Sequence, residues 1–284
     1  MSHPDLGPAR VVAWWGQDPE LARQWADRTG VERVVDRPEV LVGQVDAVLI
    51  CTWRGSDHAA LARPFLRAGV PVFVDKPFTE SIPEARELVA IAEETGAVLF
   101  TSSPWKWSPA VGEVHRRAHE LGGLRTCVAT GPYVDGPFFY VTHMVETGQF
   151  LLGTGAATVC ALETEAARVI TVTYRSGEVL VVNALRDTSA VRQVTLYGKD
   201  GYLEADINEA QKEVGMVEML AVFLRAARTG RPPLSYEHPV EATAVMAAAQ
   251  HSIERGGVPV ALDTLLRPQW GPSIGRMSNE QQAY

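Results

Sequence analysis

The fold is decided by one stretch, VDAVLICTWRGSDHAALARPFLRAGVPVFVDKP, which covers residues 45–77. Its two apolar runs, Asp46–Cys51 and Pro71–Val74, are short and bounded by turn-forming residues, a pattern typical of buried strands. Between them, the periodicity over Ser56–Ala68 predicts a helix that ends at Gly69. Strand, helix and strand in this order predict one parallel βαβ unit.

The second strand of this unit leads directly into Asp75-Lys76-Pro77, so we expect a carboxylate and an amine at the carboxyl edge of the sheet. Open parallel sheets bind ligands at that edge. The 26 Lys and Arg residues include only four lysines, and arginine does not release its proton. A lysine held between an apolar strand and a proline is therefore a candidate acid–base group. The alternative is a lysine at a strand end that points to water.

The composition, 46% hydrophobic and 21% charged over 284 residues, indicates a globular protein of one or two domains. A net charge of −8 without a basic run argues against general binding to nucleic acid or anionic membranes. No apolar stretch approaches the roughly 18 residues of a membrane helix, and the first residues do not form a secretory signal. Cys51, Cys127 and Cys160 lie far apart in apolar runs, as expected of reduced core residues. We therefore expect a cytoplasmic protein.

Strands and helices alternate through residues 1–107, which we predict to form an abbreviated Rossmann-like, dinucleotide-binding domain with a parallel sheet. Asp18 predicts the start of a helix that ends near Gly30. Ser81 opens a capping box and a second helix that ends near Gly96. Further strands are predicted at Val11–Trp15, Val34–Val35 and Val98–Ser102.

The pattern changes at Ser108, and we predict that residues 108–284 form a second, α+β domain for substrate binding and oligomerisation. Three or four strands are expected to run antiparallel between Ala157 and Asp206 as an open sheet. The other expected elements are helices from Ser108 to Gly122, from Pro137 to Gly153, over Lys212–Arg228 and over Pro239–Glu254, with strands at Leu124–Thr130 and Val258–Ala261.

Several segments in this order resemble the glucose–fructose oxidoreductase and inositol dehydrogenase family (Gfo/Idh/MocA). No single segment is specific, but together they span nearly the whole chain. They are the strand that ends at Thr52 with His58 after it, Asp75-Lys76-Pro77, Lys106-Trp107-Ser108-Pro109, His143 in a helix that ends Leu151-Leu152-Gly153, and Ala221–Phe223 with Thr229-Gly230-Arg231-Pro232-Pro233.

The resemblance implies an NAD(P)-linked oxidoreductase that acts on a sugar-like or cyclitol-like alcohol or ketone and forms dimers through its second-domain sheet. By the same resemblance, Lys76 exchanges the substrate hydroxyl proton and His143 acts beside it. The cofactor side would be formed by Thr52, Trp53, His58, Asp75 and Lys106. Loss of hydride from a C–H bond requires that the neighbouring O–H proton leave as well, so a base must contact that oxygen.

The chain departs from the family pattern in its dinucleotide-binding segment. Family members begin with a strand and a G-x-G-x-x-G loop, which is absent from this sequence. The sequence begins at what resembles the second strand, so either the sheet closes over the gap or the sequence belongs to a longer reading frame. Gly16-Gln17 replace the acid that usually binds the adenosine ribose, which favours NADP over NAD, or no cofactor.

A further departure lies four residues before His143, where many sugar dehydrogenases have aspartate and this chain has Phe139. Tyr140, His143 and Glu146 are spaced i, i+3, i+6 and are expected to line one helix face. They are candidates for a rebuilt proton relay. The alternative for His143 is a buried ring bonded to Glu146, and for Tyr140 it is packing.

Two other functions are alternatives to this oxidoreductase. A lyase or isomerase could use Lys76, Tyr140, His143 and Glu146 without a cofactor. A non-catalytic partner subunit or sensor would use the open sheet for assembly. His115 and His119 have the i, i+4 spacing of a zinc helix, but without a third ligand we expect a solvated face and no metal.

Overall fold

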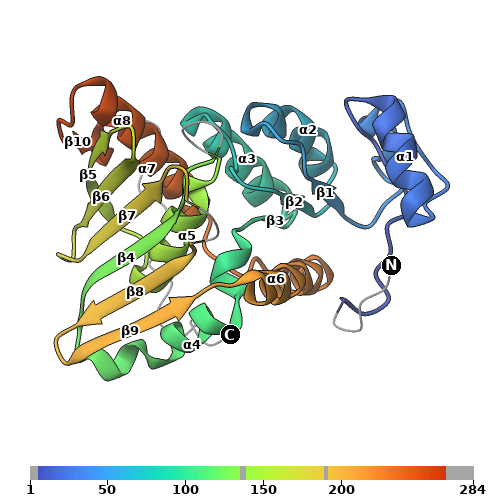
Figure 1. Ribbon diagram of the computed structural model, residues 1–284. Helices are drawn as coiled ribbons and strands as arrows, with labels where there is room; N and C mark the ends of the chain where they lie inside the picture. Colours follow the sequence, from blue (N-terminus) through green and yellow to red (C-terminus); the bar gives the residue numbers. More distant parts are fainter. Residues whose placement is uncertain (1–5, 135–138, 189–190, 267–284) are drawn as a thin grey trace.

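The computed structural model describes residues 6–134, 139–188 and 191–266. It contains a three-stranded parallel sheet and a seven-stranded, mostly antiparallel sheet, which lie side by side in Figure 1. The predicted α/β class, with a short Rossmann-like sheet and a second α+β part, is confirmed. None of the helices in the part of the chain that the structure describes is long and apolar enough to cross a bilayer.

The small sheet contains the predicted βαβ unit. Strands β1 (Val48–Ile50), β2 (Val72–Val74) and β3 (Leu99–Thr101) pair in parallel in that order. Helices α2 (Gly55–Arg67) and α3 (Ile82–Thr95) follow β1 and β2. One apolar face of the sheet packs on these two helices and the other packs on α6, so β2 and β3 are buried on both faces, as in doubly wound sheets.

Helix α6 (Glu209–Thr229) ties the second half of the chain to the small sheet. Its Met219 and Phe223 pack on Phe73 of β2 and Phe100 of β3 in one aromatic cluster. One face of the small sheet is therefore held against a helix from far along the sequence. Figure 1 shows α6 beneath the small sheet.

The N-terminal segment differs from the prediction. Helix α1 (Pro19–Thr29) forms as expected, because the Asp18 carboxylate accepts hydrogen bonds from two first-turn N–H groups and Gly30 adopts the left-handed conformation. The predicted strands at residues 11–15 and 34–35 are wrong. Only one parallel bridge forms there, between Trp14 and Val34.

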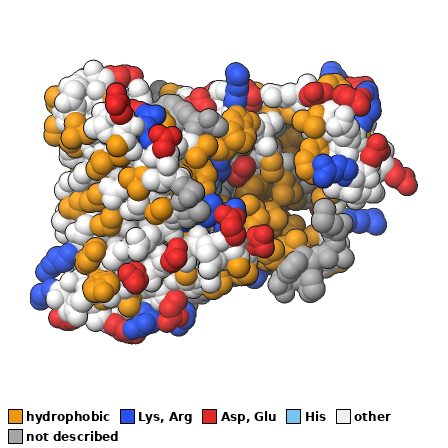
Figure 2. Space-filling view, in the orientation of Figure 1, with side chains coloured by type: hydrophobic (Ala, Val, Ile, Leu, Met, Phe, Trp, Pro, Cys, Tyr) orange, Lys and Arg blue, Asp and Glu red, His pale blue; other side chains and the backbone are white. Residues whose placement is uncertain are grey.

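The small sheet also does not close over the expected gap. Among the described residues β1 pairs only with β2, and Leu49 of β1 is 46% exposed. A strand needs a partner to complete its ladder, and residues 6–18, the described segment before α1, do not pair with β1. Figure 2 shows a hollow with largely hydrophobic walls in the region where Figure 1 places β1, α6 and the N-terminal segment.

The large sheet has the strand order β10-β5-β6-β7-β4-β8-β9. Between residues 156 and 206 it has five strands, more than the three or four predicted, and β4 pairs with β7 in parallel. Hydrogen-bonding partners far apart in sequence cannot be identified from a local pattern. The strands are β4 (Leu124–Pro132), β5 (Ala156–Glu163), β6 (Ala167–Tyr174), β7 (Val179–Leu185), β8 (Gln193–Gly198), β9 (Gly201–Asp206) and β10 (Val260–Ala261).

One face of the large sheet packs on helices α5 (Val141–Leu152) and α7 (Glu237–Glu254), and this contact forms the main core. The opposite face carries exposed hydrophobic side chains, which Figure 2 shows over the left of the molecule. The remaining elements are α4 (Pro109–Arg117), α8 (Leu262–Leu266) and the 3-10 turns η2 (Pro38–Leu41), η3 (Pro104–Trp107) and η4 (Ala118–Leu121).

The cysteines are free, as predicted, but they are not all in the core. Cys127 is buried and Cys160 is half-buried, whereas Cys51 is exposed. Cys51 follows β1, whose outer edge has no partner among the described residues, so the apolar run around it does not indicate burial.

Candidate active site

Lys76 lies directly beyond β2, at the carboxyl edge of the small sheet, and is only 7% exposed. Its Nζ lies 3.3 Å from the centre of the Phe139 ring, which in turn stacks on Trp53 at 4.0 Å. Burial lowers the pKa of the Lys76 amine, although the nearby carboxylates of Asp75 and Glu146 oppose that shift. The predicted base is thus a buried amine that releases its proton more readily than a solvated lysine.

The cofactor-side candidates Thr52, His58 and Asp75 lie on the same edge. The backbone N–H of Asp75 donates to Ile50 of β1 at 2.8 Å, and burial raises the pKa of the Asp75 carboxyl. The His58 ring lies between the carbonyl of Pro77 (2.9 Å) and that of Thr52 (3.0 Å), so it links the loops after β1 and β2. His58 therefore hydrogen-bonds to both of these loops.

His143 is held by the segment that follows β3. Its Nδ1 lies 2.8 Å from the Ser103 hydroxyl, its ring stacks on Trp105 at 5.3 Å, and the Tyr140 ring meets its edge at 4.9 Å. The interpretation that a buried His143 bonds to Glu146 is wrong, because its partner is Ser103. Burial lowers the pKa of His143 well below its ordinary value, and the charge of Lys76 acts in the same direction.

Glu146, which also lies on α5, bonds to Lys106 and Ser103 and not to His143. Its carboxylate lies 3.0 Å from Lys106 Nζ and accepts the Ser103 N–H at 2.7 Å. Both charged side chains are buried, Lys106 at 3% exposure and Glu146 at 5%. Lys106, predicted to approach the nicotinamide or substrate, is therefore held in a buried ion pair.

Tyr140 contacts Arg192, a charged residue of the site that the sequence does not single out. Its hydroxyl accepts a hydrogen bond from Arg192 Nε at 3.3 Å, and Arg192 forms an ion pair with Glu209 at 2.7 Å. The sequence also gave no role to Ser103 or to the contact of Phe139 with Lys76. Ser103 lies three residues before Lys106, so its closeness to the motif is the one signal that could have drawn attention to it.

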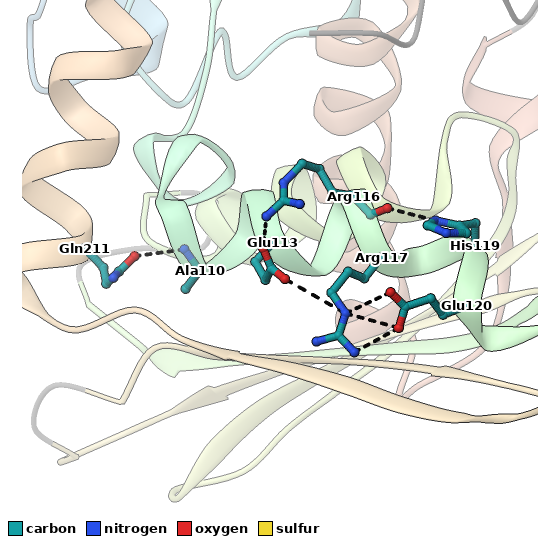
Figure 3. Close-up of polar contacts among 7 residues, drawn as sticks. All are labelled: Ala110, Glu113, Arg116, Arg117, His119, Glu120 and Gln211. Atoms are coloured by element: carbon teal, nitrogen blue, oxygen red, sulfur yellow. Dashed lines mark hydrogen bonds and ion pairs between the residues drawn. The ribbon is translucent and has the colours of Figure 1, made fainter.

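Of the zinc-like pair, His115 lies on α4 and His119 lies in the 3-10 turn η4 that follows it. His115 stacks on Phe150 at 4.5 Å, and His119 Nδ1 lies 2.9 Å from the carbonyl of Arg116. Figure 3 shows the rest of that face, where Arg117 and Glu120 form an exposed ion pair. Among the described residues no three His, Cys, Asp or Glu side chains are placed to hold a metal ion.

The residues at the carboxyl edge fit one end of a nicotinamide dinucleotide. Thr52 Oγ1, directly beyond β1, is buried and has no hydrogen-bond partner among the described atoms. A buried hydroxyl without a partner is unfavourable unless a ligand or water satisfies it. With Asp75 and Lys76 on the adjoining strand, this edge suits the nicotinamide, whereas the sequence contains no glycine loop for the pyrophosphate.

Fold and site together define a Rossmann-type α/β protein with a buried lysine at the ligand-binding edge of its parallel sheet. Residues 2–103 match the model of the GFO_IDH_MocA family, described as an oxidoreductase family with an NAD-binding Rossmann fold. This match covers the first part of the chain, where it supports the resemblance to an oxidoreductase family that the motifs predict.

Known relatives span most of the chain. D-apiose dehydrogenase from Paraburkholderia graminis is 27% identical over 82% of this chain and 69% of its own length. Inositol 2-dehydrogenase from Rhizobium meliloti is 26% identical over 70% of this chain and 68% of its own. The structure of GenD2 from gentamicin A biosynthesis, in complex with NAD, has a TM-score of 0.79 at 21% identity and covers 89% of this chain and 88% of that one. At that identity the structural likeness concerns the fold alone.

Proposed function

We propose that this protein is an NAD(P)-linked oxidoreductase that interconverts an alcohol and a ketone on a sugar-like or cyclitol-like substrate. The observation that carries the proposal is the buried Lys76 amine, whose pKa is lowered, at the carboxyl edge of the parallel sheet. The curated relatives named D-apiose dehydrogenase and inositol 2-dehydrogenase support this substrate class.

In the oxidative direction, neutral Lys76 accepts the proton of the substrate hydroxyl, and in the reductive direction the ammonium returns it. A bound nicotinamide would supply the other half of the chemistry by accepting or donating the hydride. Thr52 and Asp75 would hold the nicotinamide end. His143 would contact the substrate oxygen from α5, and the aromatic pair of Phe139 and Trp53 covers Lys76 and limits the access of water to it.

The choice of cofactor belongs to this proposal as well. Gly16-Gln17, and not the acid that usually binds the adenosine ribose, stand at the end of the segment that bridges to Val34. An acid at that place would repel the 2′-phosphate of NADP. We therefore favour NADP over NAD.

The function is tested by titrating the full-length protein with NADH and NADPH and by assaying polyol oxidation. Lys76→Met should abolish turnover, with a loss of at least about 100-fold, because it removes the group proposed to accept the hydroxyl proton. Lys199→Met is the matched control, since Lys199 is exposed on the turn between β8 and β9. Failure of both nucleotides to bind would refute the proposal.

A cofactor-independent lyase or isomerase is the second candidate, because the buried Lys76 amine and the buried His143 ring could exchange protons with a substrate without a nucleotide. Turnover without added nucleotide, lost in Lys76→Met, would establish it. Turnover that depends strictly on nucleotide would exclude it. A protein whose activities all survive Lys76→Met would instead be a partner subunit or sensor.

We also propose a homodimer formed through the open face of the large sheet. Strands β5, β6, β8 and β9 present Leu162, Val169, Tyr197 and Tyr202 there, each at least 37% exposed. These side chains form two exposed apolar pairs on this face, and exposed apolar groups of this kind are available for protein–protein contact.

A further inference from the structure

Ser103 is a buried residue between the two halves of the site, and every polar atom of its side chain can be accounted for. The hydroxyl oxygen accepts the backbone N–H of Trp105 at 3.2 Å and lies 2.8 Å from His143 Nδ1. Its own backbone N–H donates to Glu146. Among the described residues, His143 Nδ1 is the one acceptor within hydrogen-bond distance of the hydroxyl hydrogen.

Two neutral forms of His143 are compatible with the 2.8 Å contact. If Nδ1 carried the hydrogen, it would donate to the Ser103 oxygen, and the buried hydroxyl hydrogen would have no acceptor. If Nε2 carries it, the Ser103 hydroxyl donates to Nδ1 and every polar group of Ser103 is paired. Because an unpaired buried polar hydrogen is unfavourable, the second form is preferred.

The ring's surroundings fix its orientation and oppose its protonation. The Trp105 ring stacks on it with an interplanar angle of 7°, and the Tyr140 ring meets its edge at 72°. Gly131 makes room for this stack, since a Cβ there would lie 2.7 Å from the Trp105 ring. Lys76, Arg192 and Lys212 all place positive charge near His143, and they disfavour the imidazolium.

We infer that Ser103 is a positioning residue that holds His143 as the neutral tautomer with its proton on Nε2. Resting on the proposed function, this makes His143 a hydrogen-bond donor to the substrate oxygen and leaves Lys76 as the proton acceptor. No proton leaves His143 in the reaction. It polarises the oxygen, and the O–H proton passes to the Lys76 amine.

The experiment is ¹⁵N–¹H correlation NMR of the full-length protein with ¹⁵N-labelled histidine at neutral pH. Two-bond couplings distinguish a ring protonated at Nε2, at Nδ1 or at both. The His143 signals are assigned by their loss in His143→Gln. We expect the Nε2–H pattern in the wild-type protein, and an Nδ1–H or imidazolium pattern would overturn the inference.

Variants distinguish a positioning role of Ser103 toward His143 from a role in packing alone. In Ser103→Ala the His143 pattern should become a mixture of tautomers, and kcat should fall about 10-fold or more with KM changed less, whereas Ser103→Thr should retain the wild-type pattern. Ser102→Ala is the matched control. Ser102 is equally buried, but its hydroxyl donates to the Ser103 carbonyl and accepts Trp107 Nε1–H, so the pattern should not change.

The NMR result does not depend on catalysis. An Nε2–H pattern that Ser103→Ala disturbs, in a protein that oxidises no polyol, would support the inference and refute the proposed function. An unchanged pattern in Ser103→Ala would refute the positioning role, whatever the activity.

Discussion

Replacement of either partner of the Lys106–Glu146 ion pair should destabilise the protein strongly. The two charges lie 3.0 Å apart and are almost fully buried. At an effective dielectric constant of about 20 their attraction is about 5 kcal/mol, which offsets the cost of removing each ion from water. A single substitution leaves the other charge buried without its partner, so Lys106→Met and Glu146→Gln should each cost about 3–5 kcal/mol.

The measurement is urea unfolding followed by circular dichroism. With a slope of about 2.5 kcal/mol per molar, such a loss lowers the unfolding midpoint by about 1–2 M. The double variant Lys106→Met/Glu146→Gln removes both charges and keeps an acceptor for the Ser103 N–H. It should be more stable than the sum of the single losses predicts, with a coupling energy of about 2 kcal/mol or more.

The exposed pair of Arg117 and Glu120 provides the control (Figure 3). Its atoms lie 2.8 Å apart, closer than the buried pair, but both side chains are more than 40% exposed. Because water screens such a pair, Glu120→Gln should barely change the midpoint. If Glu146→Gln has an equally small effect, or if the double variant is simply additive, then the site is not a dry ion pair and the argument from burial fails.

The remaining predictions concern pH dependence and assembly. The rate of alcohol oxidation should rise with pH as Lys76 loses its proton, with an inflection below the ordinary lysine value of 10.5, and the rate of ketone reduction should fall over the same range. In Phe139→Asp a carboxylate replaces the ring over Lys76, so the inflection should move up by about one pH unit or more, and an unchanged pH profile would exclude Lys76 as the titrating group. Val169→Glu, on the open sheet face, should halve the mass seen by light scattering, whereas Val214→Glu on exposed α6 should not, and a monomeric wild-type protein would refute the dimer.

Helix ends were predictable from the sequence because their signals are local. The Asp18 and Ser81 side chains cap α1 and α3 as expected, and Gly30 and Gly96 end them in the left-handed conformation. The prediction of a strand over Val11–Trp15 was wrong because strands depend on non-local contacts: a strand forms only where a neighbouring strand completes its hydrogen bonds. The parallel contact of β4 with β7 joins segments about 50 residues apart, and no local pattern specifies it.

The placement of the site was predictable to the same limited extent. Parallel strands bring their carboxyl ends to one edge, so Asp75 and Lys76 could be assigned to that edge from the βαβ pattern alone. The contacts of Ser103 with His143 and of Lys106 with Glu146 each join residues 40 positions apart in the chain. They depend on how α5 packs against η3, which follows from the tertiary core and not from spacing.

The two lysines near this edge differ in the partner that the fold gives each. The Lys106 amine faces a carboxylate at 3.0 Å, so removal of its proton would leave Glu146 as a buried charge without a counter-ion. The Lys76 amine faces the Phe139 ring, which attracts a cation far more weakly than a carboxylate does, while burial disfavours its charge. The same residue type is therefore fixed as a structural cation at one position and free to exchange a proton at the other. Helix α5 carries Glu146, the partner of Lys106, and Phe139, which covers Lys76, lies just before its first residue. The position of this helix therefore determines which of the two amines can act as the base.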